Sequence, residues 1–152
     1  MTRINTVPPR ALTDQHLLGE YNEIRRPIRL AIKRYNKQKE EIHRGIPSTY
    51  ELRAGHVIFF YNKLQYIKDR FEAIKTEMRL RGWSANGIID ADIPEELLGN
   101  WTASERSNSI LKERLIERIL QDPKGLTKWR YYGKSIDESY IKTLQQAPSW
   151  TQ

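Results

Sequence analysis

Apolar residues recur at helical spacing in three stretches of the chain, and no stretch shows the alternation of a half-buried strand. The intervals between these residues are three and four positions, which puts them on one face of a helix. We therefore predict an all-α fold, a compact single domain of three principal helices. The three apolar stripes are Leu17, Tyr21, Ile24 and Ile28; Val57, Phe60, Leu64, Ile67, Phe71, Ile74 and Met78; and Leu111, Leu115 and Ile119.

Capping and helix-breaking residues set the expected ends of these helices. The first begins at Thr13 or Asp14, both acceptable caps, and is expected to kink at Pro27, which cannot donate a backbone hydrogen bond. The second ends at Gly82. The third opens with the capping-box pattern of residues 102–105.

The segments outside the helices are expected to be an extended arm and long loops. Pro8 and Pro9 make residues 1–11 an arm that crosses the domain. Residues 44–54 and 83–101 contain glycine, proline and polar residues and are expected to be loops.

Length and composition restrict the class of protein. A chain of 152 residues fits one domain, which we place at residues 1–134, and residues 135–152 form a tail with a short helix followed by a loose end. The chain has no cysteine and three scattered histidines, so we expect no metal site and no cofactor. It has no apolar run long enough for a signal peptide or a membrane span. We expect a cytoplasmic monomer without membrane contact.

Positive charge is concentrated in one part of the chain. The formal net charge is +7, and residues 25–44 carry eight basic and two acidic residues, which is +6 of that total. Such a block favours binding to a polyanion such as DNA. A solvated helix face is an equally acceptable interpretation of the charge alone.

The start of the chain contains a candidate nucleophile. A small second residue normally allows Met1 to be removed, which leaves Thr2 with a free α-amine. Because an α-amine titrates near pH ~8 and a lysine near ~10.4, the terminus offers roughly hundreds of times more unprotonated nitrogen at neutral pH. Such an amine can attack a sugar carbon and form an imine.

Polar residues on the first predicted helix can assist that chemistry. His16, Glu20 and Glu23 lie within an arc of roughly 60° on one flank. A carboxylate there can move protons and stabilise positive charge on a sugar. From the residues alone, Glu20 and Glu23 are equally eligible.

Four separated segments, in the same order, resemble the pyrimidine-dimer DNA glycosylases of the phage endonuclease V type. They cover residues 1–5, 14–23, 55–64 and 129–134, and the resemblance extends from Met1 to about Lys134. It implies an all-α enzyme with glycosylase and AP lyase activity on cyclobutane pyrimidine dimers, acting at double-stranded DNA that it kinks and from which it extrudes a base. It also implies Thr2 as the nucleophile and Glu23 as the catalytic acid.

The resemblance also implies a set of DNA-binding residues. Arg3 and Arg26 are expected to hold phosphates beside the lesion, and Gln15 and His16 to lie near the DNA, with capping or a buried polar role as the alternative for these two. Asn22 and Arg25 depart from the phage enzyme, which has arginine and proline there, so the phosphate contacts are expected to be rearranged.

The residues themselves add three further candidates. Arg114 and Arg118, one turn apart on the third predicted helix, are expected to reach the same DNA backbone from the other side, with solvated charges as the alternative. Lys134 belongs to a basic and aromatic segment that either contacts DNA or closes a small core. The full set of predicted DNA-binding residues is Arg3, Gln15, His16, Asn22, Arg25, Arg26, Arg114, Arg118 and Lys134.

Two other functions remain open from the sequence. One keeps the imine chemistry but acts on another damaged or modified pyrimidine. The other is a basic DNA-binding protein that keeps the fold without catalysis.

Overall fold

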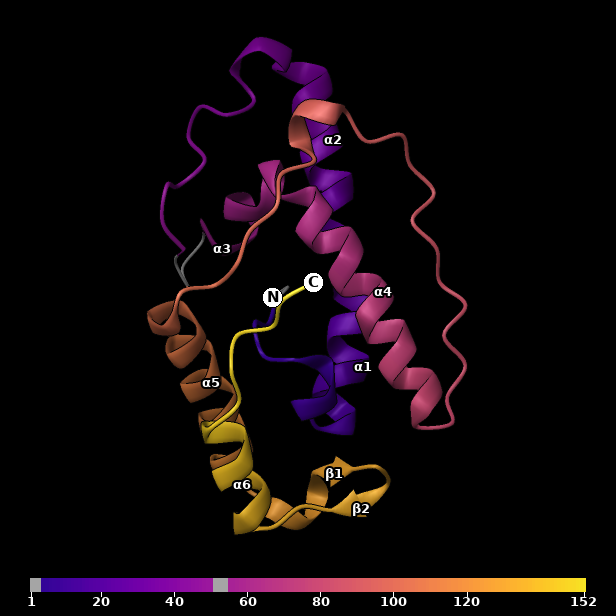
Figure 1. Cartoon of the computed structure of the whole chain (residues 1–152), viewed down its shortest axis with the longest axis vertical. Helices are drawn as coiled ribbons and strands as arrows, with labels where there is room; N and C mark the ends of the chain where they lie inside the picture. Colours follow the sequence, from indigo (N-terminus) through magenta and orange to yellow (C-terminus); the bar gives the residue numbers. More distant parts are fainter. Residues whose placement is uncertain (1–3, 51–54) are drawn as a thin grey trace.

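The computed structural model describes residues 4–50 and 55–152, and this part of the chain is mostly helical (Figure 1). The predicted all-α class is confirmed. The helices are α1 (Asp14–Glu23), α2 (Arg26–Lys37), α3 (Gly55–Ile58), α4 (Leu64–Leu80), α5 (Glu105–Leu120) and α6 (Glu138–Gln145). Single 3-10 turns lie at Pro9–Ala11, Lys39–Glu41, Phe59–Asn62, Glu95–Leu97 and Leu126–Lys128.

The N-terminal arm, residues 4–11, runs between two groups of helices. Helices α1 and α4 pack together on one side of it, and α5 with α6 lies on the other (Figure 1). Ile4 and Val7 are fully buried in this position. The arm is extended as predicted, except that it ends in the 3-10 turn Pro9–Ala11, where a proline is compatible with the first helical position.

The first predicted helix is divided into two helices instead of being kinked. Its cap is confirmed, because the Thr13 side chain accepts a hydrogen bond from the backbone N–H of His16. Helix α1 ends at Glu23 and α2 begins at Arg26, with Pro27 in the first turn of α2. A proline is tolerated in a first turn, where its missing N–H has no intrahelical partner to lose.

The prediction of one continuous second helix was wrong at Lys63. The backbone of Lys63 has φ −128° and separates the turn Phe59–Asn62 from α4. The backbone of Gly99 packs against this break, since a Cβ on Gly99 would lie 2.3 Å from the carbonyl oxygen of Asn62. The predicted stop at Gly82 is confirmed by its φ of +86° and by the Trp83 N–H, which donates to the Met78 carbonyl.

The third predicted helix forms, but its cap is two residues later than the pattern suggested. Ser104 accepts from the backbone N–H of Ser107 and caps α5. The predicted loop before it contains only the short turn Glu95–Leu97 as regular structure.

The structure also contains a small two-stranded sheet that the sequence pattern did not predict. Strands β1 (Arg130–Tyr131) and β2 (Lys134–Ser135) pair antiparallel in a minimal hairpin. Its two turn residues, Tyr132 and Gly133, both have positive φ, at 51° and 78°. A two-residue strand is too short to produce an alternating pattern in the sequence.

The end of the chain is packed against the domain and is not loose as expected. The short terminal helix forms as α6, capped by Asp137. Beyond it, the backbone N–H of Trp150 donates to the Thr6 carbonyl of the arm at 2.6 Å. In the described residues, no helix has the length and apolarity to cross a membrane.

Candidate active site

A cavity of about 260 Å³ lies between α1, α5 and the segment that precedes the hairpin. Five of the predicted site residues line it: Gln15, His16, Glu23, Arg114 and Arg118. The other lining residues are Asn5, Gly19, Glu20, Leu115 and Trp129. The fold thus brings together residues that are about a hundred positions apart in the sequence.

The structure distinguishes the two carboxylates that the sequence left equally eligible. Glu20 is 3% exposed, and its two carboxylate oxygens accept from the Arg70 guanidinium at 2.5 and 3.0 Å. Glu23 is exposed at the end of α1 and lines the cavity. Only the carboxylate of Glu23 is therefore accessible to a large substrate.

Glu20 also holds the N-terminal arm. One of its oxygens accepts from the Asn5 side-chain amide at 2.8 Å, and the Asn5 carbonyl accepts from the Tyr66 hydroxyl at 3.1 Å. The backbone N–H of Ile4 donates to Nε2 of His56 at 2.9 Å. These contacts fix the first described residues of the arm against α1, α3 and α4. Thr2 and Arg3, the proposed nucleophile and its neighbour, lie outside the described residues.

His16 stands on the wall of the cavity against Trp129, with the ring centroids 4.6 Å apart. Burial, with a smaller contribution from the positive charge of Arg118, lowers the pKa of His16 to about 4. His16 is therefore a neutral imidazole at neutral pH.

This shift predicts a pH-dependent loss of stability. Between pH ~6.5 and about 4 the unfolded chain binds a proton at His16 that the folded protein does not bind, so the free energy of unfolding falls as the pH falls. The expected loss is up to about 3 kcal/mol between pH 7 and pH 4, from ~1.4 kcal/mol per pKa unit. Urea unfolding at pH 7 and pH 4 measures it.

A His16→Phe variant, which keeps the ring against Trp129, should lose most of that pH dependence. A His43→Gln variant, changed at an exposed position, is the control and should keep the wild-type pH dependence. An unchanged pH dependence in His16→Phe would show that His16 is not its source.

The cavity wall contains polar atoms that the protein leaves without partners. Among the described residues, the buried side-chain atoms with no hydrogen bond are Oδ1 of Asn5, Nε2 of His16 and Nε1 of Trp129. All three residues line this one cavity. Because an unsatisfied buried polar atom costs about 1–3 kcal/mol, their grouping is typical of a site that receives a polar ligand.

Gln15 uses both ends of its amide within the protein. Its Nε2 donates to the Lys128 carbonyl at 2.7 Å, and its Oε1 accepts from the Arg130 N–H at 3.0 Å. These two bonds hold Trp129, which lies between the two contacted residues, against His16. Gln15 therefore positions Trp129 beside the cavity, which is neither of the roles, capping or a buried polar contact, given as its alternative.

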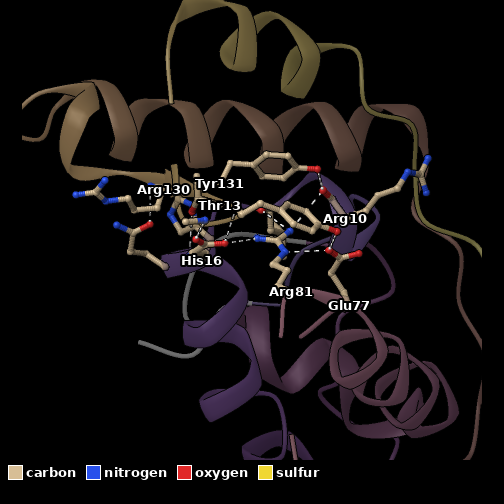
Figure 2. A network of polar contacts seen from close by, with 12 residues as sticks. Arg10, Thr13, His16, Glu77, Arg81, Arg130 and Tyr131 are labelled. Carbon is tan, nitrogen blue, oxygen red and sulfur yellow. Dashed lines mark hydrogen bonds and ion pairs between the residues drawn. The ribbon is translucent and has the colours of Figure 1, made fainter. Parts of the chain in front are cut away.

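A second network attaches the hairpin to the start of α1 (Figure 2). The Arg81 side chain is fully buried and donates to Asp14 at 2.7 Å and to Glu77 at 2.9 Å. Asp14 in turn accepts from the turn residues Tyr132 and Gly133 at 3.1 and 2.8 Å. The network holds the hairpin, and the residues that precede it, beside the cavity.

The other predicted site residues that the structure describes do not line this cavity. Asn22 and Arg25 line a separate hollow of about 340 Å³ together with Arg29 and residues 88–91. The Arg25 guanidinium packs over the rings of Tyr21 and Phe71, at 5.6 and 5.4 Å from their centroids.

Two predicted site residues line neither hollow. Arg26 is exposed at the start of α2, close in sequence to Glu23. Lys134 is exposed on β2. Among the described residues, the predicted arginines therefore form two groups, Arg114 and Arg118 on α5 and Arg25 and Arg26 at the start of α2, and Lys134 lies on β2.

Two polar residues that support the site were not predicted from the sequence. Asn5 lines the cavity, and Arg70 binds the carboxylate of Glu20. Arg70 lies in the apolar stripe of α4, beside Phe71 and Ile74, and it is 0% exposed. An arginine at the centre of an apolar stripe was the available signal. Asn5 gave no comparable signal, because its partners are distant in sequence.

A family model described as pyrimidine dimer DNA glycosylase matches residues 1–90. The matched range contains Thr2, Glu23 and the arm, whereas Arg114, Arg118 and Lys134 lie beyond it. Across the residues that the structure describes, no group of three His, Cys, Asp or Glu side chains is placed to hold a metal ion.

Proposed function

The chain belongs to the pyrimidine dimer DNA glycosylase family, and from this premise we propose that it excises cyclobutane pyrimidine dimers from double-stranded DNA and then nicks the strand as an AP lyase. The nucleophile in this proposal is the α-amine of Thr2. The observation that carries it is the course of the arm, since Asn5 is bonded to Glu20, one helical turn from Glu23. Thr2 is three residues before Asn5 in the chain.

The proposed reaction has two steps. The Thr2 amine forms a bond to C1′ of the deoxyribose at the 5′ side of the dimer, and the glycosidic bond breaks with its electron pair leaving on the base nitrogen. Loss of the amine proton and opening of the sugar ring give the imine. Removal of a proton from C2′ then expels the 3′ phosphate by β-elimination, and water hydrolyses the imine to free the amine.

Glu23 is proposed to act electrostatically and as a proton carrier. Its carboxylate lines the cavity, where a negative charge stabilises the positive charge that develops on the sugar as the base departs. The same group can take the proton from the attacking amine or from C2′. Both functions require a carboxylate that the substrate can reach, which distinguishes the exposed Glu23 from the buried Glu20.

The two groups of cations are proposed to hold the DNA on either side of the reacting sugar. Arg114 and Arg118 lie on one wall of the cavity, and Arg26 lies just beyond Glu23 at the start of α2. Arginine suits phosphate because its planar guanidinium donates two parallel hydrogen bonds. Arg3 adjoins the nucleophile in sequence and is proposed to contact a phosphate as well.

Borohydride trapping on dimer-containing duplex DNA tests the proposal. The wild-type protein should form a covalent complex that survives denaturation, because borohydride reduces the imine to a stable amine. Mass spectrometry of a tryptic digest should then find the adduct on the peptide that begins with Thr2. A protein acetylated at its terminus should bind the same DNA and form no covalent complex, and an adduct on a lysine would contradict the proposal.

The hollow that Asn22 and Arg25 line bears on which class of lesion the protein accepts. Its lining differs from the phage enzyme at both positions, so another damaged pyrimidine remains a candidate substrate. Trapping on matched duplexes that contain a cyclobutane dimer, an oxidised pyrimidine or a plain AP site separates these substrates. The proposal requires the dimer to be processed faster than the oxidised pyrimidine.

A further inference from the structure

The last residues of the chain contact the N-terminal arm directly. We name residues 146–152 the terminal segment. Its Trp150 donates from the backbone N–H to the Thr6 carbonyl at 2.6 Å. The Trp150 ring packs edge-on against Tyr66, with centroids 5.4 Å apart, and the Arg70 guanidinium lies 5.5 Å from its centre. Figure 1 shows the segment beside the arm, between α4 and α5.

One buried side chain joins the terminal segment, the arm and α5. Asn108 is 4% exposed, and its Nδ2 donates to the Ala147 carbonyl at 3.1 Å. Its Oδ1 accepts from the Thr6 hydroxyl at 2.8 Å. Lys112 adds a second contact by donating to the Ala147 carbonyl at 2.9 Å.

The arm is therefore supported from two sides. Glu20, Arg70 and Tyr66 hold Asn5 and Val7 from the side of α1 and α4. The terminal segment and Asn108 hold Thr6 from the other side. Because residues of an extended chain alternate in direction, consecutive arm residues are fixed by opposite walls.

Support of the arm affects the rate of a reaction in which the nucleophile is the terminal amine of the chain. A terminal amine has no helix or strand to set its position, and attack requires the reacting atoms about 3–3.5 Å apart. A displacement of 1 Å can reduce a rate about 100-fold. The arm contacts at residues 4–7 are the nearest described positions that can restrain Thr2.

We propose that Trp150 and the terminal segment are positioning elements that hold the N-terminal arm in place for imine formation. The inference rests on the proposed function of the Thr2 amine. It assigns the tail a role in the rate of the covalent step and not in DNA affinity.

Trp150→Ala and Trp150→Phe test the inference in the full-length protein. Trp150→Ala removes the ring contacts with Tyr66 and Arg70, and it should lower the single-turnover trapping rate on saturating AP-site DNA about 10- to 100-fold. The dissociation constant for the same DNA should stay within about twofold. Trp150→Phe keeps an aromatic ring and should restore most of the rate.

A matched control separates positioning from general stability. Trp83→Ala changes another half-buried tryptophan that packs on the core after α4. It should leave the trapping rate within about twofold of wild type. An equal rate loss in Trp83→Ala and Trp150→Ala, or a wild-type rate in Trp150→Ala, would overturn the inference.

Hydrogen exchange gives a readout that does not need the reaction. In Trp150→Ala the hydrogen-bonded arm amides of Ile4 and Asn5 should exchange at least tenfold faster, while amides in the middle of α4 keep their protection. Unchanged protection in the arm would also overturn the inference. If the wild-type protein forms no imine, the proposed function fails, and the exchange data still decide whether the terminal segment holds the arm.

Discussion

A Glu23→Gln variant is expected to form the trapped imine at least 100-fold more slowly than the wild-type protein under single-turnover conditions on dimer-containing DNA. Glutamine has nearly the same size but cannot accept a proton or carry negative charge. General acid–base catalysis contributes about 10²–10⁴-fold, and the loss of an electrostatic contact to a charged transition state is of similar size. Quench-flow trapping with borohydride measures the rate.

The control for this variant is Glu113→Gln, the same change at an exposed position of α5. It should leave the trapping rate within about twofold. The dissociation constant of Glu23→Gln for the same duplex should not rise, since removing a negative charge near phosphates does not weaken binding. Retention of more than a tenth of the wild-type rate would exclude Glu23 from the catalytic role.

The helices and their caps were largely predictable because their signals are local. Thr13 caps α1 through a hydrogen bond three residues along the chain, and Gly82 stops α4 through its own positive φ. The apolar stripes of α1, α4 and α5 are buried as their spacing indicates, with Leu17, Phe71 and Leu111 at 0% exposed. In each case the physical cause lies within about four residues of its effect.

The predictions that failed concern features that depend on contacts between distant parts of the chain. Lys63 interrupts a helical pattern because the backbone of Gly99, a distant residue, packs against Asn62. The hairpin exists because Asp14 and Arg81 attach its turn to α1 and α4. No window of sequence around either position contains these partners.

In the candidate site, too, the features set by local spacing were predictable and those set by distant contacts were not. The flank of His16, Glu20 and Glu23 follows from helical spacing, and five of the predicted residues do line one cavity. The different roles of Glu20 and Glu23 could not be predicted, because they depend on Arg70, which is 50 residues from Glu20 in the chain. The sequence therefore predicted that both carboxylates share one flank, and the structure shows that Glu23 is exposed there while Glu20 is buried.

The buried Glu20–Arg70 pair holds the N-terminal arm, and its disruption is expected to destabilise the fold. Both side chains are almost fully buried, at 1% and 0% exposed. Burial alone would lower the pKa of Arg70, but the negative charge of Glu20 and its hydrogen bonds outweigh that effect and raise it. Arg70 therefore stays charged in the folded protein.

An Arg70→Met variant is accordingly expected to lower the free energy of unfolding by about 3–5 kcal/mol, because it leaves the Glu20 carboxylate buried without its partner. Urea denaturation at neutral pH measures the change. The double variant Glu20→Gln, Arg70→Met should recover part of the loss, since no uncompensated charge remains. Arg106→Met, the same change at an exposed position of α5, should stay within about 0.5 kcal/mol of wild type. If the double variant were less stable than Arg70→Met, the buried charge would not be the cause. The arm contacts of Asn5 and Val7 would then account for the stability that Arg70 provides.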